Sequence, residues 1–184
     1  MTLSSPRIAL FLALLAVPSW AGKDPDPVPA KAGLAAARAA ALAWAQDAVL
    51  VYIENDEDLA AGGGSPRWSY LFRSGAKKRA RGYSVRDGEI VASSYLPFAF
   101  DSPPNQEGWI DSGAAERAAD EKGGREYRDL HGGAPATMLL MRGAFYDKDP
   151  DLTTWTVIYR APGAPSLFVL VDAATGKAKR SWVG

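Results

Sequence analysis

Two segments far apart in the chain have nearly the same pattern of side chains. Residues 68–73 read Trp-Ser-Tyr-Leu-Phe-Arg, and residues 155–160 read Trp-Thr-Val-Ile-Tyr-Arg. The first and last positions are identical, and the other four keep their polarity. Apolar side chains at every second position lie on one face of a β-strand. The pattern therefore predicts two equivalent strands, led by Trp68 and Trp155, each with one buried face.

The neighbours of these strands also match. Before each Trp-led strand come an apolar segment and then an acidic loop. After it come a further strand, a glycine turn and a last strand. In the first copy these are residues 48–53, 54–58, 83–85, 87–88 and 89–91, and in the second copy 136–141, 147–151, 167–172, 173–176 and 177–182. Asp87-Gly88 is typical of a two-residue hairpin, in which both central residues take positive φ. Each copy is thus predicted to contain four antiparallel strands.

Each copy is also expected to open with a helix. Leu34, Ala37, Ala41, Trp44 and Ala48 recur at spacings of three and four, which is one helical stripe. In the second copy, Ser112 is a plausible N-cap for a helix over 114–122, which Gly123-Gly124 ends. The residues that follow, 125–135, have an irregular pattern.

These elements predict an α+β fold of two tandem units, each a helix packed on a four-stranded antiparallel sheet. The units are assigned to residues 34–92 and 111–184, with a linker over 93–110 that packs through its aromatic residues. Each unit is small for an independent core, so we expect the two to share an interface. Trp44, Trp68 and Trp155 are expected in the core, whereas Trp109 and Trp182 lie near element ends and are candidates for exposed contacts.

The N-terminus has the pattern of a secretory signal peptide over residues 1–21. Arg7 precedes an apolar run over 8–17, and Ala21 is a small residue at the position that a signal peptidase needs. Cleavage is predicted between Ala21 and Gly22, with an uncleaved membrane anchor as the alternative. Residues 22–33 carry Pro25, Pro27 and Pro29 and are predicted to form an extended tether. The mature chain, without a transmembrane segment, is expected to be secreted or periplasmic.

Composition excludes several classes of site. The chain has no cysteine, one histidine, and equal numbers of basic and acidic residues, 21 of each. Disulfides, thiolate metal sites, cysteine nucleophiles and multi-histidine metal sites are therefore excluded, and the lack of net positive charge argues against nucleic-acid binding. His131 lies in Leu-His-Gly-Gly and is expected to be a surface or turn residue. Thr175-Gly176-Lys177 does not fit a phosphate-binding loop, because Val171 and Ala178 occupy required positions. No cofactor is expected.

Aspartates at 147, 149 and 151 have the spacing that opens an EF-hand loop. Leu152 and Ile158 stand where that loop needs glycine and glutamate. A solvated acidic loop is therefore favoured, and weak calcium binding is the alternative.

The second copy resembles the C-terminal half of PepSY domains. The resemblance is carried by residues 155–159, followed by Leu-Phe-Val-Leu-Val-Asp-Ala-Ala-Thr-Gly-Lys over 167–177, and the first copy is similar more loosely. PepSY domains occur outside the cytoplasm, including in propeptides of thermolysin-like peptidases, and the resemblance implies binding or restraint of a peptidase. The architecture is also similar to that of β-lactamase inhibitory proteins, which use disulfides that this chain cannot form. Neither resemblance supplies a catalytic residue.

The densest cluster of charge is basic. It comprises Arg73, Lys77, Lys78, Arg79 and Arg81, between the Trp68 strand and the next strand. The matching loop of the second copy, 161–165, has no charge, so the fold does not require the cluster. Lys77, Lys78 and Arg79 are therefore the predicted partner-binding residues, and a solvated hairpin tip is the alternative. Because consecutive loops of a meander lie at opposite ends of the sheet, acidic and basic loops should separate.

These observations favour a non-catalytic module that binds another protein, such as a peptidase or an envelope component. The alternative is a module that binds a small molecule or a polysaccharide. An enzyme is the third possibility, since a pair of carboxylates alone can support hydrolysis.

Overall fold

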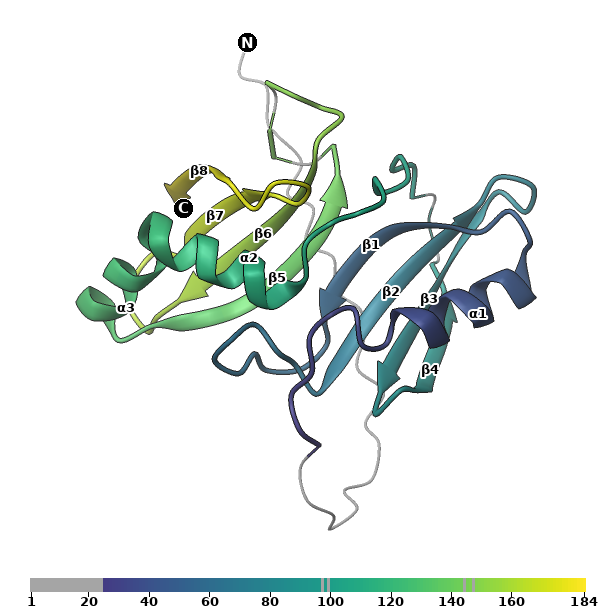
Figure 1. Ribbon diagram of the computed structural model, residues 1–184, viewed down its shortest axis with the longest axis horizontal. Helices are drawn as coiled ribbons and strands as arrows, with labels where there is room; N and C mark the ends of the chain where they lie inside the picture. Colours follow the sequence, from purple (N-terminus) through teal and green to yellow (C-terminus); the bar gives the residue numbers. More distant parts are fainter. Residues whose placement is uncertain (1–24, 97, 99, 144, 147) are drawn as a thin grey trace.

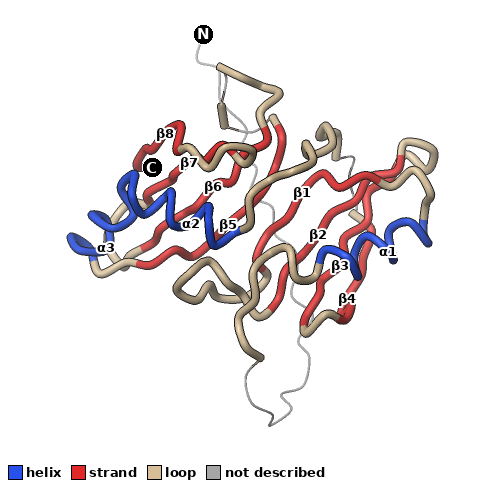
Figure 2. The backbone as a smooth tube through the Cα atoms, in the orientation of Figure 1, coloured by secondary structure: helices blue, strands red, loops and turns tan. Residues whose placement is uncertain are grey.

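The computed structural model describes residues 25–184 except 97, 99, 144 and 147. One antiparallel sheet of eight strands carries helices on one face (Figures 1 and 2). The elements are α1 (Leu34–Trp44), β1 (Val49–Asn55), β2 (Arg67–Ser74), β3 (Arg79–Arg86), β4 (Glu89–Tyr95), α2 (Ser112–Ala119), η1 (Asp120–Gly124), α3 (Arg125–His131), β5 (Ala134–Arg142), β6 (Thr153–Arg160), β7 (Leu167–Asp172) and β8 (Ala178–Val183). The signal segment predicted over 1–21 and the first aspartate of the predicted 147–151 loop lie outside the described residues.

The strand order is β4-β3-β2-β1-β5-β6-β7-β8, and β1 pairs with β5. The predicted α+β fold with antiparallel strands is confirmed, but the structure does not have a four-stranded sheet for each unit, because all eight strands form one continuous sheet. The reason lies in β1, where residues 50–53 are buried on both faces. A strand of this kind at a sheet edge would expose apolar surface and unpaired backbone groups. Residues 52–54 pair with β5, and the Leu50 carbonyl accepts the Asn105 N–H, so both contacts reduce that exposure.

The two predicted Trp-led strands are confirmed as β2 and β6, with the predicted faces buried. Trp68, Tyr70 and Phe72 are at most 1% exposed, and Trp155, Val157 and Tyr159 are fully buried. The Trp68 and Trp155 rings meet edge to face, with their centroids 6.2 Å apart. The larger apolar core therefore spans both halves under the helices, and a smaller cluster comprises Val51, Tyr52, Leu71 and Ala80.

Two hairpin turns have the predicted backbone. Asp87 and Gly88 between β3 and β4 take φ values of 52° and 77°, and Gly176 between β7 and β8 takes φ 73°. These conformations fit residues that tolerate the left-handed region.

Helix α1 packs closely on the sheet through Ala37 and Ala41, which are fully buried. These small side chains let the helix approach the strands.

The burial of Trp44 and Trp109 differs from the prediction. Trp44 is only half-buried and meets the Tyr95 ring edge-on, whereas Trp109 is buried at 4% exposure. Trp109 packs against the Trp155 ring, with centroids 5.9 Å apart, and so extends the core. Trp182 is half-buried and stacks on Phe168.

The second helical region is capped one residue earlier than predicted, because Asp111 is the N-cap of α2 and its side chain accepts the N–H of Ser112. The helix is interrupted at the predicted Gly123-Gly124, since Gly123 leaves the helical range of φ and ψ, and α3 follows after this kink. Gly124 lies against the Tyr159 ring, where a Cβ atom would come within 2.3 Å of the ring carbon Cζ. This glycine therefore also lets the kinked region approach β6.

The predicted tether over 22–33 is wrong for the part that is described. Ala30 is fully buried, and Val28 pairs with Ser65. The Trp68 Nε1 donates to the Val28 carbonyl at 2.8 Å, and the Tyr70 hydroxyl donates to the Ala30 carbonyl at 2.7 Å. Buried indole and phenol groups need acceptors, and this segment supplies them.

Candidate functional site

The predicted partner-binding residues lie at the turn between β2 and β3. Lys77, Lys78 and Arg79 are all exposed, and Lys78 takes a left-handed φ of 51°. They project at the tip of a hairpin whose strands are paired along their full length. The structure therefore places these three cations together on the surface.

Asp47, which follows α1, holds this turn in one shape. Its Oδ1 accepts the Ser74 hydroxyl at 2.6 Å, and its Oδ2 accepts the Ala76 N–H at 2.8 Å. The Lys77 N–H in turn donates to the Ser74 Oγ at 3.0 Å. The Ser74 hydroxyl, followed by the Ala76 N–H, lowers the pKa of the Asp47 carboxyl. The turn is thus ordered before any partner arrives.

Two arginines of β3 lie over an aromatic ring of β4. The guanidinium carbons of Arg79 and Arg81 are 5.5 Å and 5.2 Å from the centroid of the Tyr95 ring. Arg81 also donates from Nη2 to the Ser93 hydroxyl at 2.9 Å. We call Lys77, Lys78, Arg79, Arg81 and Tyr95 the basic edge.

The basic edge carries charge that is not compensated locally. In the part of the chain that the structure describes, no ion pair joins Lys77, Lys78, Arg79 or Arg81 to a carboxylate, whereas neighbouring Arg73 lies 3.1 Å from Asp101. Unpaired cations on one surface attract an anionic partner and accelerate its association.

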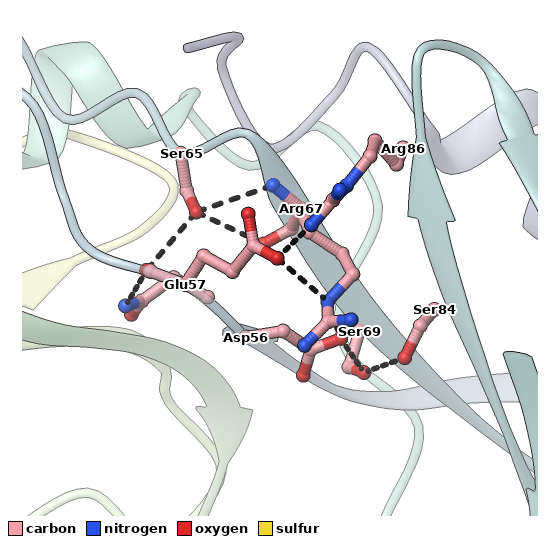
Figure 3. Close-up of polar contacts among 8 residues, drawn as sticks. Asp56, Glu57, Ser65, Arg67, Ser69, Ser84 and Arg86 are labelled. Atoms are coloured by element: carbon pink, nitrogen blue, oxygen red, sulfur yellow. Dashed lines mark hydrogen bonds and ion pairs between the residues drawn. The ribbon is translucent and has the colours of Figure 1, made fainter. Parts of the chain in front are cut away.

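The acidic loop after β1 lies at the other end of β2, but its charges are paired (Figure 3). The Arg67 Nε lies 3.4 Å from the Asp56 Oδ2 and 3.6 Å from the Glu57 Oε1, and Arg86 contacts the same Glu57 oxygen. The predicted separation of acidic and basic loops is therefore incomplete. Arg67 and Arg86 escaped sequence reasoning because they lie at strand ends, outside the dense cluster.

Hydroxyl groups complete this acidic network. The Ser69 Oγ donates to the Asp56 Oδ2 at 2.7 Å and lies 2.8 Å from the Ser84 Oγ. The network thus joins the loop after β1 to β2 and β3. The Asp56 and Glu57 carboxylates both contact arginines at the ends of β2 and β3, so the geometry fits a structural clamp.

A second ion pair anchors the kinked helical region to the sheet. The Arg128 Nη1 and Nη2 donate to the Asp120 Oδ1 and Oδ2 at 2.5 Å and 2.6 Å. The Tyr159 hydroxyl donates to the same Oδ1 at 2.6 Å. Burial raises the pKa of the Asp120 carboxyl, but the bonds from Arg128 and Tyr159 together outweigh burial and leave that pKa below its usual value.

A cavity of about 230 Å³ lies between α1 and the segment before α2. Its wall includes Leu42, Phe72 and Asn105. The side-chain Nδ2 and Oδ1 atoms of Asn105 are buried and form no hydrogen bond with any residue that the structure describes. A buried amide without a partner is uncommon, and it marks a place where a ligand could supply the missing bonds.

The remaining sequence candidates are dispersed. His131 is exposed at the end of α3, with its ring 4.9 Å from that of Tyr127. Asp151 pairs with Arg142 at 2.9 Å. Among the residues described, no group of three or more histidine, aspartate or glutamate side chains could hold a metal ion.

None of the helices described between residues 25 and 184 combines the length and hydropathy of a membrane-spanning helix.

Comparison with known proteins yields a likeness of fold. No protein-family model and no curated protein matches the chain. The crystal structure of a protein from Clostridium difficile 630, described as a "putative lipoprotein", superposes with a TM-score of 0.54 at 11% sequence identity. The match covers 78% of this chain and 87% of that one. At this identity the likeness concerns the fold alone.

Proposed function

We propose that this chain is an exported, non-catalytic module that binds an acidic surface of another protein through its basic edge. The observation that carries the proposal is the exposed turn at Lys77, Lys78 and Arg79, ordered by Asp47 and free of described ion pairs. The turn between β6 and β7, at the corresponding place in the second half, carries no charge. The cations are therefore not needed to form a hairpin of this kind.

Export is part of the proposal. Its support is the signal-peptide pattern over 1–21, together with a structural neighbour that is described as a lipoprotein. N-terminal sequencing of the protein recovered from the periplasm or the medium tests it. We expect the mature chain to begin at Gly22, and a cytosolic protein that begins at Met1 would contradict export.

We further propose that the two halves are copies of one PepSY-like unit, and that the partner is a peptidase or an envelope component. The supporting observations are the matched positions of Trp68 and Trp155. Each is buried, and each donates its indole N–H at 2.8 Å to a backbone carbonyl just before a helix, that of Val28 or Ile110. A crystal structure in which the two halves superpose would support the repeat, and unlike chain paths would refute it.

The binding proposal is tested by changing Lys77, Lys78 and Arg79 to serine together. The matched control changes Lys122, Arg125 and Lys177, which are exposed elsewhere, and so removes the same charge. Both variants should keep the free energy of unfolding within about 0.5 kcal/mol of the wild type. Recovery of partners from an envelope extract should fall, and lose its salt dependence, only in the first variant. Equal loss in both variants would mean that net charge alone acts.

The cavity beside α1 favours a second function, the binding of a small molecule. Its wall combines apolar side chains such as Leu42 and Phe72 with polar ones such as Arg38, and together with the buried Asn105 amide it suits a compound that carries an amide group. Titration with N-acylated amino acids and with small saccharides, followed by the NMR signals of the Asn105 side chain, tests this alternative. Unchanged signals at saturating ligand would contradict it.

A further inference from the structure

Among the residues that the structure describes, strand β4 forms an open edge of the sheet. It is the last strand of the order and pairs with β3 on one side. Every residue from Glu89 to Tyr95 is exposed, unlike any other strand of the sheet. An exposed edge presents backbone N–H and C=O groups that a further strand can pair with.

This edge lacks the features that usually block such pairing. The opposite edge, β8, carries Lys179 and Arg180, whereas β4 has no charge and no proline between Ile90 and Tyr95. Ile90, Val91 and Tyr95 are 39%, 51% and 48% exposed. Natural edge strands are commonly protected by lysine, proline or strong twisting. In β4, only the register shift beside Val91 offers such protection.

The register shows which backbone groups face outward. Just past β4, the Leu96 N–H donates to the Ala80 carbonyl of β3 at 3.1 Å. Since backbone groups alternate along an antiparallel strand, Ser94 points toward β3, and Ser93 and Tyr95 direct their N–H and C=O groups to the open side. The outward N–H and C=O groups of Ser93 and Tyr95 therefore lie at the end of β4 where the basic edge is.

We propose that the partner adds an extended, acidic segment to β4 as a ninth strand; this rests on the function proposed above and specifies its mode of binding. Every strand pair of the sheet is antiparallel, so an added antiparallel strand continues the same geometry. Its N-terminal end then lies beside Tyr95, Arg79 and Arg81, and its C-terminal end lies beside Glu89. Charge complementarity requires acidic residues at the N-terminal end and a basic residue at the C-terminal end of the segment. Backbone bonds supply the affinity, and these charges fix the direction.

The probe is a synthetic peptide, acetyl-Glu-Glu-Val-Thr-Val-Thr-Val-Lys-amide, added to the full mature protein. Binding should slow hydrogen exchange at the Ser93 and Tyr95 amides and leave the exchange of β8 unchanged. The peptide with the same residues in reverse order should bind more weakly. Equal binding of both peptides would contradict the proposal that charges at the two ends of the segment fix its direction on β4.

Ser93→Pro is the decisive variant, because it removes an outward N–H and leaves the β3–β4 bonds in place. Ser93→Ala is its matched control, since it deletes the bond with Arg81 but keeps the N–H. Ser93→Pro should weaken peptide binding at least about tenfold relative to Ser93→Ala. Should Ser93→Pro fail to fold, Val91→Lys, with Val91→Thr as control, tests the edge in the same way.

Three outcomes overturn the proposal. Equal binding by Ser93→Pro and Ser93→Ala would place the peptide elsewhere. Self-association of the wild type in sedimentation, abolished by Ser93→Pro, with no peptide binding, would show that a second copy occupies the edge. If the triple serine variant loses its envelope partners while Ser93→Pro retains them, the proposed function stands and strand addition fails.

Discussion

Individual polar atoms in the core explain where the proline-containing segment before α1 lies. The buried indole of Trp68 and hydroxyl of Tyr70 need acceptors, and the proline-containing segment before α1 provides them. The alternation of residues 68–73 predicted which side chains are buried. It could not predict the acceptors, because any carbonyl within reach would satisfy a tryptophan N–H.

Asp120 gives a prediction at the scale of one residue. Its folded-state pKa lies below the usual aspartate value, so its contribution to stability is present above about pH 4 and is lost as the pH falls through the folded pKa. Asp120→Asn should lower the free energy of unfolding by about 2 kcal/mol at pH 7, because Arg128 loses its charged partner. Urea unfolding from pH 7 to pH 2 should show a shallower acid dependence in this variant. Asp129→Asn, at an exposed position, is the control, and an equal change there would contradict the prediction.

At the scale of elements, strand positions followed from periodicity, and helix ends did not. The second helical region was expected to stop at Gly123-Gly124, since glycine is a common helix terminator. In the structure Gly124 serves a tertiary contact with Tyr159, a residue far along the chain. The pair of glycines thus interrupts the helix at Gly123, as predicted, and also allows a close packing contact that local sequence could not show. The irregular pattern over 125–135 did not indicate that a further helix, α3, follows the kink.

Gly124 therefore gives the prediction for this element. Gly124→Ala places a methyl group within 2.3 Å of the Tyr159 ring and should cost about 1–3 kcal/mol of stability through overpacking. Gly75→Ala is the control, because its Cβ would lie 3.6 Å from the Asp47 Oδ2 in ordinary contact. Chemical denaturation measures both variants. A neutral Gly124→Ala would mean that the helical region does not pack closely on β6.

For the whole molecule, the repeated pattern predicted strands within each half but not the pairing between halves. The joining strands, β1 and β5, meet over Tyr52–Met141, Ile53–Leu140 and Glu54–Leu139. The Asn55 Oδ1 also accepts the Met138 N–H at 2.7 Å. Neither segment carries a signal that names its partner strand, since apolar residues on both faces indicate only that a strand is central. The basic cluster was the one candidate site that sequence could locate, because its charge had no counterpart in the second half.

The contact between Trp68 and Trp155 predicts that the two halves unfold together. Trp68→Ala and Trp155→Ala should each cost about 3–5 kcal/mol, and the double variant should cost less than their sum by about 1 kcal/mol. Trp182→Ala combined with Trp68→Ala should be additive, because Trp182 stacks on Phe168 at the far edge. Urea titrations that follow fluorescence and circular dichroism provide the measurement. Two separate transitions in the wild type would contradict a shared core.

The position of β1 also sets an order in time. A ribosome makes β1 and β2 early, but β5, which covers the other side of β1, appears only after more than half of the chain has been made. Until then the nascent protein has an apolar strand with one unpaired side, and such edges promote aggregation. Folding can be completed only after β6 brings Trp155 to Trp68. A chaperone that shields residues 49–55 during synthesis would therefore act on the one strand that must wait for its neighbour.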